Sequence, residues 1–252
     1  MKVQEIVNII EKFAPCELAY PWDNTGFIIG DFEKEVIKVF VTLDITKETV
    51  NMAVECGADM IISHHPIMFK GIQRINYSDY EGYIIKELIK NDIALYVSHT
   101  STDCTDGGIN DHLAKIIGLK ECKKLNDDGL GRIGKLINNI TLKEFAEIVK
   151  KALNTSFVKV YGDTERKINT VAVCGGSGSD LVDDAIRMGA DVLVTGDIKY
   201  HTGIDVVHSG LALIDAGHYP TEVFVQDIFA DLLRDTGIEV IKSTHKDIFK
   251  VV

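Results

Sequence analysis

Short strand-like segments alternate with amphipathic helix-like segments along this chain, and that alternation constrains its fold most. Each strand-like segment is rich in β-branched or aliphatic residues, and an apolar helical stripe follows most of them. The expected strands are residues 36–43, 59–63, 93–97, 170–173, 192–194 and 211–214. The expected helices are residues 3–13, 47–56, 80–90, 105–115, 180–188 and 221–234. Strand–helix–strand units of this length predict an α/β fold with mainly parallel strands.

The sequence also contains an internal repeat. Residues 39–59 align without gaps with residues 171–191, and both segments read as strand, helix, glycine turn and strand. Within these segments Gly57-Ala58-Asp59 matches Gly189-Ala190-Asp191, and a second pairing follows outside them, Ala94-Leu95 with Ala212-Leu213. Two related α/β lobes explain the repeat. Convergence of independent strand–helix–strand units on one turn sequence explains it equally well.

The passage between two such lobes has one good candidate. Residues 123–134 are polar and rich in glycine, which is typical of a connection rather than of a buried element. We therefore expect approximate lobes at residues 1–124 and 125–252.

Composition restricts the classes of function. Hydrophobic residues make up 46% of the chain and charged residues 26%, as in globular proteins, which argues against disorder. The 27 basic and 38 acidic side chains give a formal charge of −11, so the surface repels nucleic acids and anionic membranes. An anionic small-molecule ligand would need a local positive centre.

The sequence favours a cytoplasmic protein without a membrane partner. No apolar run approaches the roughly 18 residues of a membrane span. Gln4 and Glu5 lie where a signal peptide would have its apolar core. The five cysteines are scattered and include no CxxC pair, which predicts reduced thiols rather than a disulfide framework or a thiolate zinc site.

Side chains that can bind a metal ion or take part in catalysis gather where three of the predicted strands end. They are His64 and His65 after residues 59–63, Asp103 after residues 93–97, and His218 with Glu222 after residues 211–214. Parallel α/β sheets bind ligands beyond the carboxyl ends of their strands. Pro220 and Thr221 suit a first helical turn, so His218 and Glu222 can reach one spot above the helix start.

Each of these clusters has a structural alternative. His64 and His65 can be hydrogen-bonded turn histidines, and Asp103 can cap the helix at 105–115. Glu222 can be a first-turn acid that the helix dipole favours. Together, however, three imidazoles and two carboxylates form a nitrogen–oxygen set suited to Zn, Mn, Fe or a similar divalent ion. Five ligands fit two ions about 3.5–4 Å apart, with Glu222 or a water bridging them.

Such a centre would carry net positive charge, because two divalent ions outweigh two carboxylates and one bridging hydroxide. It would attract an anionic substrate within an acidic protein. It would also hold hydroxide at neutral pH, since a bound metal lowers the pKa of water to about 7.

Six motifs lie in order along almost the whole chain. They are Asp23-Asn24-Thr25-Gly26-Phe27, Ser63-His64-His65-Pro66, His99-Thr100-Ser101-Thr102-Asp103, Cys174-Gly175-Gly176-Ser177-Gly178, Thr195-Gly196-Asp197 and Gly217-His218-Tyr219-Pro220-Thr221-Glu222. Together they resemble the Nif-three-like dinuclear metal-centre family, whose members are often labelled GTP cyclohydrolase 1 type 2 homologues. The chain is similar to the short form, which lacks the domain that some members insert between the lobes.

This resemblance implies one family domain over residues 1–252, made of two interlocked α/β lobes and assembled into a homohexameric ring of dimers. It implies two divalent metal ions per chain, at the carboxyl ends of strands between the lobes. The implied ligands are His64, His65, Asp103, His218 and Glu222. Glu222 would bridge the ions, and the segment 218–222 would return to the site of the first lobe. Ser101-Thr102 departs from the family, where Asn and an aliphatic residue are usual; this concerns substrate contact rather than metal binding.

Four further features have weaker signals. His99 lies near Asp103, where it can carry protons or orient a ligand, or simply be a packed histidine. Asp197 and His201 can lie at the rim of the site or cap a helix. Gly175–Ser179 can form a phosphate-binding turn, although it lacks the third glycine of a dinucleotide motif and the lysine of a P-loop. Asp23–Gly26 is expected to form a turn facing the site.

These observations predict a dinuclear metal-dependent hydrolase for an anionic, nucleotide-like, phosphorylated or cyclic-amidine substrate. In the GTP cyclohydrolase reaction that the family label implies, the bridging hydroxide would attack C8 of GTP and release formate. His99 would be the catalytic proton carrier. A two-metal phosphoesterase and a metal-binding regulatory or delivery scaffold without turnover are the alternatives.

Overall fold

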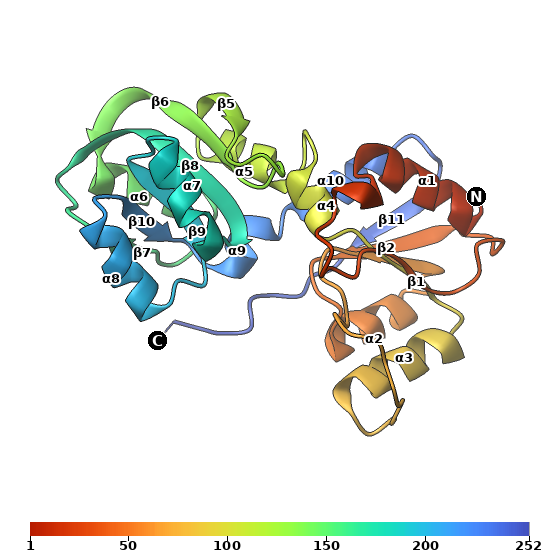
Figure 1. Cartoon of the computed structure of the whole chain (residues 1–252). Coiled ribbons are helices and arrows are strands. Elements are labelled where there is room, and N and C mark those ends of the chain that lie inside the picture. Colours follow the sequence, from red (N-terminus) through yellow and green to blue (C-terminus); the bar gives the residue numbers. More distant parts are fainter. Residues whose placement is uncertain (252) are drawn as a thin grey trace. The chain divides into compact units, whose positions relative to one another are not determined.

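The computed structural model describes residues 1–251, which form two compact units (Figure 1). The first unit comprises Met1–Thr105 and Val223–Lys246. The second comprises Asp106–Glu222 and the C-terminal residues from Asp247. The chain therefore passes between the units at Thr105 and again at Glu222, whereas the sequence analysis placed the division at residues 124 and 125.

The first unit is built on a five-stranded sheet in the order β1-β4-β3-β2-β11. Its strands are β1 (Gly26–Ile29), β2 (Lys38–Thr42), β3 (Met60–Ser63), β4 (Ala94–Val97) and β11 (Glu239–Lys242). Only β1 pairs antiparallel among these described strands, at the edge beside β4. The predicted strands at 36–43, 59–63 and 93–97 thus form the parallel centre of this sheet.

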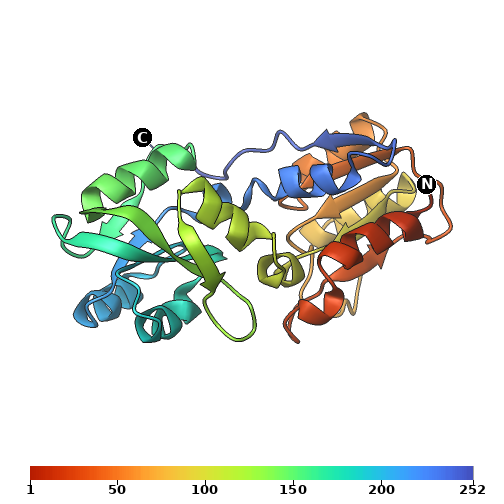
Figure 2. The ribbon, with the colours of Figure 1, turned by 90° about the horizontal axis from the view of Figure 1, so that it is seen from above.

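Helices cover both faces of the first sheet. They are α1 (Val3–Phe13), the 3-10 helix η1 (Cys16–Leu18), α2 (Lys47–Glu55), α3 (Tyr80–Lys90), α4 (Thr100–Cys104) and α10 (Val225–Leu233). α2 and α3 share a buried cluster with the sheet, with Phe40 and Ile61 among its members. α1 and α10 lie together over the other face (Figure 2). Burial on both faces explains why these strands are continuously apolar in sequence.

The second unit is built on a six-stranded sheet in the order β5-β6-β8-β9-β10-β7. Its strands are β5 (Lys120–Lys124), β6 (Arg132–Thr141), β7 (Lys159–Tyr161), β8 (Lys167–Ser177), β9 (Val192–Gly196) and β10 (Ala212–Asp215). β8, β9 and β10 are parallel, and antiparallel strands extend this centre on both sides. The α/β class with mostly parallel strands is therefore confirmed.

The helices of the second unit are α5 (Ile109–Ile116), α6 (Leu142–Ala152), the 3-10 helix η2 (Ser179–Leu181), α7 (Val182–Arg187), α8 (Tyr200–His208) and α9 (His218–Glu222). α7 and α8 pack on the sheet through a buried cluster that includes Ala185 and Val206. α6 begins with a capping box, in which Thr141 and Glu144 satisfy each other's backbone amides.

The glycine-rich stretch at 123–134 lies within the second sheet. It contains the end of β5 and the start of β6, which pair antiparallel. Gly129 and Gly131 adopt φ values of 90° and 71°, which only glycine accepts readily in the turn between them. The composition correctly indicated a turn, but this turn joins two neighbouring strands of one unit.

The single helix expected at 221–234 is two helices. α9 ends at Glu222 and contacts β8 and β9, whereas α10 begins at Val225 and contacts β2 and β11. The apolar stripe is continuous in sequence because both helices are buried, and periodicity alone does not reveal that they belong to different units.

The internal repeat has a matching backbone geometry in the two units. Asp59 Oδ2 accepts hydrogen bonds from the amides of residues 37 and 38, at 2.8 and 2.9 Å. Asp191 Oδ2 accepts the corresponding bonds from residues 169 and 170, at 2.8 and 2.9 Å. The short helices α4 and α9 likewise each begin three residues after a strand ends. This shared detail supports two related lobes, because convergence on a fold does not require the same side-chain contacts.

Within residues 1–251, every helix is too short or too polar to cross a membrane.

Candidate metal centre

His64 is held at the carboxyl end of β3. Its amide donates to the Thr42 carbonyl, which extends the strand pairing beyond Ser63. The ring is buried, and its Nδ1 lies 2.9 Å from the Ser98 carbonyl. Since a carbonyl only accepts, Nδ1 carries the proton and Nε2 is the nitrogen suited to a metal ion. Nε2 lies 3.7 Å from Asp103 Oδ1, so these two predicted ligands are neighbours.

His65 is oriented by a carboxylate from the neighbouring strand. Its Nδ1 lies 2.7 Å from Oδ1 of Asp44, which follows β2. The His64 and His65 rings are 4.9 Å apart at their centroids. In the sequence, Asp44 simply follows the predicted strand at residues 36–43. Because β2 and β3 are parallel neighbours, Asp44 lies at the same edge of the sheet as His64 and His65, and this position is the signal that could have identified it.

His99 joins the same cluster. Its Nδ1 lies 2.8 Å from Asp23 Oδ1, so the turn at Asp23–Gly26 reaches the site as expected. His64, His65 and His99 each offer a ring nitrogen within 4.8 Å of the others, a spacing that can hold a metal ion. The structure therefore places His99 among the histidines of the site and not in a separate packed position.

Asp23 is an unusually acidic group. Burial alone would raise its pKa, but hydrogen bonds from His99 and from the amide and hydroxyl of Thr100 outweigh burial. Together they lower the pKa of Asp23 from 3.8 to about 2. Asp23 is consequently ionised at neutral pH and lies 2.8 Å from His99 Nδ1 as a carboxylate.

Asp103 belongs to the short helix α4. Buried hydroxyl groups support this helix, because Ser98 Oγ lies 2.7 Å from Thr102 Oγ1 and 3.1 Å from Ser101 Oγ. The alternative that Asp103 caps the following helix is wrong, since Gly108 is the N-cap of α5.

In the second unit, His218 and Glu222 occupy opposite ends of α9. His218 Nε2 lies 3.0 Å from Glu222 Oε2, and His218 Nδ1 lies 2.7 Å from Asp197 Oδ2. Glu222 is the last residue of α9, so it is not the first-turn acid that the alternative interpretation required. The helix instead brings its imidazole and its carboxylate together on one side.

Asp197 contacts the ring of His218 and does not cap a helix. Lys199 is the N-cap of α8, and Asp197 holds His218 from a backbone φ of 56°. A side chain in this left-handed conformation is strained, and such strain is typical of functional positions. His201 lies within α8, where its ring packs against Tyr200 at 5.6 Å.

Gly176 in β8 makes room for the His218–Glu222 pair. A Cβ at this position would lie 2.3 Å from Glu222 Oε1 and 3.0 Å from His218 Nε2. β8 therefore packs directly against both side chains, and this close approach requires glycine at position 176.

The turn at Gly175–Ser179, which could form a phosphate-binding turn, has side-chain partners for three of its amides. Its amides at Gly175, Gly176 and Gly178 already donate to side-chain oxygens, at 2.9, 3.0 and 2.8 Å. The acceptors are Asn110, Thr221 and Thr195. Amides used in this way support α9 and β9, and they no longer attract an anion.

The four site histidines share one arrangement. Each has an oxygen at Nδ1, and in three of them that oxygen belongs to a carboxylate: Asp44, Asp23 or Asp197. His112 and His208, in contrast, bond to helix carbonyls four residues earlier. Metal-binding histidines characteristically donate their second ring nitrogen to a carboxylate or carbonyl, which fixes the tautomer and raises ligand basicity. The histidines of the first unit, which lie within reach of one another, therefore fit a divalent metal ion.

Comparisons with known proteins find similar proteins over nearly the whole chain. A family model described as Duf34/NIF3 (NGG1p interacting factor 3) matches residues 1–248. The chain is 36% identical to a GTP cyclohydrolase 1 type 2 homolog of Clostridium perfringens, with 100% of both chains covered. It is 39% identical to the protein of the same name from Streptococcus pneumoniae, covering 91% of this chain and 89% of that one. Among solved structures, a Bacillus cereus protein related to NIF3 matches with a TM-score of 0.93 at 27% identity, covering 100% and 99%.

Proposed function

The chain belongs to the Duf34/NIF3 family, and from that premise we propose that it is a dinuclear metal-dependent hydrolase. His64, His65 and Asp103 of the first unit and His218 and Glu222 of the second would hold two divalent ions. The observation that carries the proposal is the oxygen partner at Nδ1 of every one of these histidines. That arrangement leaves each Nε2 oriented as a ligand atom.

The chain's own residues have separable roles in such a reaction. When bound, divalent ions would supply Lewis acidity and a source of hydroxide at neutral pH. Asp44 and Asp197 orient His65 and His218, while Gly176 leaves the space that Glu222 occupies. His99 would move the proton at Nε2, because the Asp23 carboxylate stabilises the Nδ1 proton in both states.

The substrate class in this proposal is an anionic nucleotide-like molecule. The names of the relatives suggest GTP and a cyclohydrolase reaction, in which opening of the imidazole ring would release formate. A two-metal phosphoesterase uses the same donor set, so the assay should include both GTP and a phosphodiester.

Metal analysis of the purified protein is the first test. The proposal expects two ions per chain, and fewer in both Asp103→Asn and Glu222→Gln, because each unit would contribute ligands. Glu165→Gln, at an exposed position away from these residues in sequence, is the matched control and should keep both ions. Retention of both ions by either ligand variant would contradict the proposal.

Turnover is the second test. Zinc-, manganese- and iron-loaded protein should release formate from GTP or hydrolyse a phosphodiester, and His65→Ala should abolish that activity while the protein remains folded. Full metal loading without turnover on either substrate would instead favour a metal-binding regulatory or delivery scaffold.

A further inference from the structure

Two exposed aromatic rings lie beside His99 in the first unit. Trp22 and Phe69 are 57% and 53% exposed, although both are large apolar groups. Their ring centroids lie 6.0 and 5.8 Å from that of His99, and 6.0 Å from each other. Tyr20 stacks on Trp22 at 6.0 Å with an interplanar angle of only 12°. We call Trp22 and Phe69 the aromatic platform.

Hydrogen bonds fix the aromatic platform relative to the site. The Tyr20 amide donates to Thr100 Oγ1 at 3.0 Å, and the same hydroxyl donates to Asp23 at 2.6 Å. Asn24 Nδ2 donates to the Met68 carbonyl at 2.8 Å, which ties the Trp22 segment to the loop that carries Phe69. The network that orients His99 thus also positions both rings.

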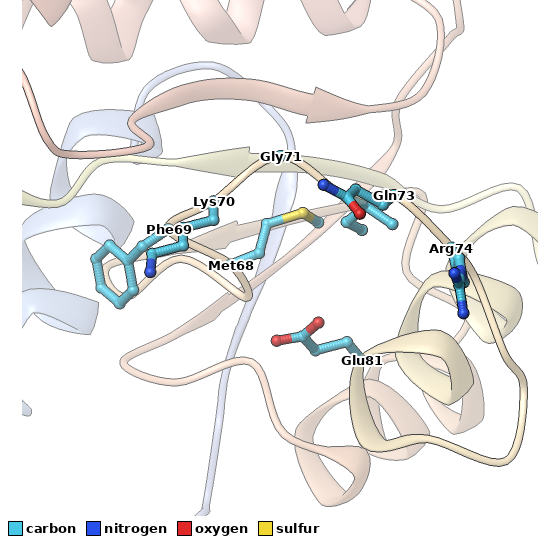
Figure 3. Close-up of a pocket in the computed structure, with 8 residues that line it drawn as sticks. Met68, Phe69, Lys70, Gly71, Gln73, Arg74 and Glu81 are labelled. Atoms are coloured by element: carbon cyan, nitrogen blue, oxygen red, sulfur yellow. The ribbon is translucent and has the colours of Figure 1, made fainter.

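The loop that carries Phe69 borders an open pocket. Residues 68–74 and Glu81 of α3 line about 480 Å³, and the Glu81 carboxylate points into this space (Figure 3). Phe69 and Arg74 lie at opposite ends of this stretch of loop (Figure 3). The lining carries two positive side chains, Lys70 and Arg74, against one negative side chain, Glu81. In a protein with a formal charge of −11, this lining complements an anionic group next to an aromatic one.

We propose that the aromatic platform binds the planar heteroaromatic ring of an anionic small molecule by stacking, with Lys70 and Arg74 attracting its anionic group. This inference rests on the proposed function, since it names how the substrate of that site would be held. Aromatic side chains stack on any heteroaromatic base, so the platform selects a ring but not one particular base. The acidic surface favours a small ligand over a nucleic acid.

Trp22 is the only tryptophan of the chain, so its fluorescence reports directly on the platform. We expect GMP to quench this emission saturably in the metal-loaded protein. Ribose 5-phosphate, which lacks the base, should leave the emission unchanged. Guanosine, which lacks the phosphate, should quench with a weaker apparent affinity.

Substitution separates stacking from general binding. Phe69→Leu should raise the dissociation constant for GMP by about five- to a hundredfold, the range measured for loss of one stacking partner. Trp22→Leu should do the same in calorimetry. Phe32→Leu is the matched control: Phe32 is 40% exposed and follows the end of β1 that lies by Leu95, away from His99. It should bind GMP like the unmodified protein.

Several results would overturn the inference. Three of them are unchanged Trp22 emission with GMP, equal quenching by ribose 5-phosphate, and unchanged GMP affinity in Phe69→Leu. The fourth is a change of Trp22 emission with protein concentration alone, because it would indicate that a second copy of the chain covers the platform. GMP binding with these properties but without metal uptake would contradict only the proposed function. Two bound ions with no ring binding would contradict only this inference.

Discussion

At the scale of residues, the site depends on pairs in which an acidic side chain fixes an imidazole. Asp44, Asp23 and Asp197 each lie within 2.8 Å of a histidine Nδ1. A charge-assisted hydrogen bond of this length both restrains the ring and selects the tautomer. The carboxylate partners therefore hold these three rings in place.

Removing Asp44 should weaken metal binding through His65. We expect Asp44→Ala to lower metal affinity about 10–100-fold, as is usual for the loss of a carboxylate behind a histidine ligand. Competition with a chelator measures this affinity directly. Asp31→Ala, an exposed aspartate in the same unit, should bind metal normally. Unchanged affinity in Asp44→Ala would mean that His65 does not coordinate through Nε2.

Asp23 should make stability depend on pH at the acid end. Because its folded-state pKa is lowered from 3.8 to about 2, Asp23 stabilises the fold above pH 3.8, and that contribution disappears as pH falls towards 2. We expect Asp23→Asn to be less stable by about 2 kcal/mol near neutral pH. Urea unfolding in the presence of chelator should show this difference shrinking between about pH 4 and pH 2. A difference that stays constant over that window would refute the assignment.

At the scale of elements, β8 and α9 can approach each other closely because Gly176 in β8 has no side chain. Gly176 has a φ of 62°, and the space in front of it is filled by Glu222 and His218. Adding a side chain at Gly176 should therefore lower stability for two reasons, the left-handed backbone and the steric clash. A second glycine with the same backbone but no clash allows the two contributions to be measured separately. Gly189 has a φ of 75°, but a Cβ added there would meet no atom within 4 Å.

Gly176→Ala should impair both stability and metal binding, because the added methyl group must displace Glu222. We expect Gly189→Ala to cost about 1–2 kcal/mol from the left-handed backbone alone. Gly176→Ala should cost more than this and also reduce metal content. Thermal unfolding and metal analysis of the two variants test the comparison; equal losses of stability with normal metal content in both would exclude the steric explanation.

At the scale of the whole molecule, the chain crosses between its two units more than once. Residues 223–246 return to the first unit, where β11 pairs with β2 in parallel register. Each sheet therefore depends on residues distant in sequence. This connectivity makes the first unit incomplete if the chain is cut after Glu222.

At the scale of the assembled molecule we propose a homohexamer, as the resemblance of the six sequence motifs to the family implies. Light scattering coupled to size-exclusion chromatography should give six times the chain mass of 27.9 kDa. The mass should be independent of protein concentration in the micromolar range, and a mass of one or two chains would exclude the ring.

The local elements and the types of side chain at the strand ends could be predicted from neighbouring residues. Hydrophobic periodicity predicted α1 and α3 with their observed bounds, because an apolar stripe on one helix face is a local property. The strands predicted at residues 59–63 and 93–97 are present as well, although each begins one residue later, at Met60 and Ala94. The repeated Gly-Ala-Asp turn also encoded a hydrogen-bond pattern that the two units share.

Only the tertiary structure decided which of those groups act together. Asp44 and Asp197 each lie 21 positions from the histidine they hold, and Asp23 lies 76 positions from His99. Parallel pairing brings such distant strand ends side by side, and no local pattern records that pairing. The same reason explains why the amides of Gly175–Ser179 resemble an anion site in the sequence. Their hydrogen-bond acceptors, such as Asn110, belong to other elements and cannot be recognised from the local sequence. Secondary structure follows from neighbouring residues, whereas the hydrogen-bond partner of a side chain follows from how the strands and helices pack.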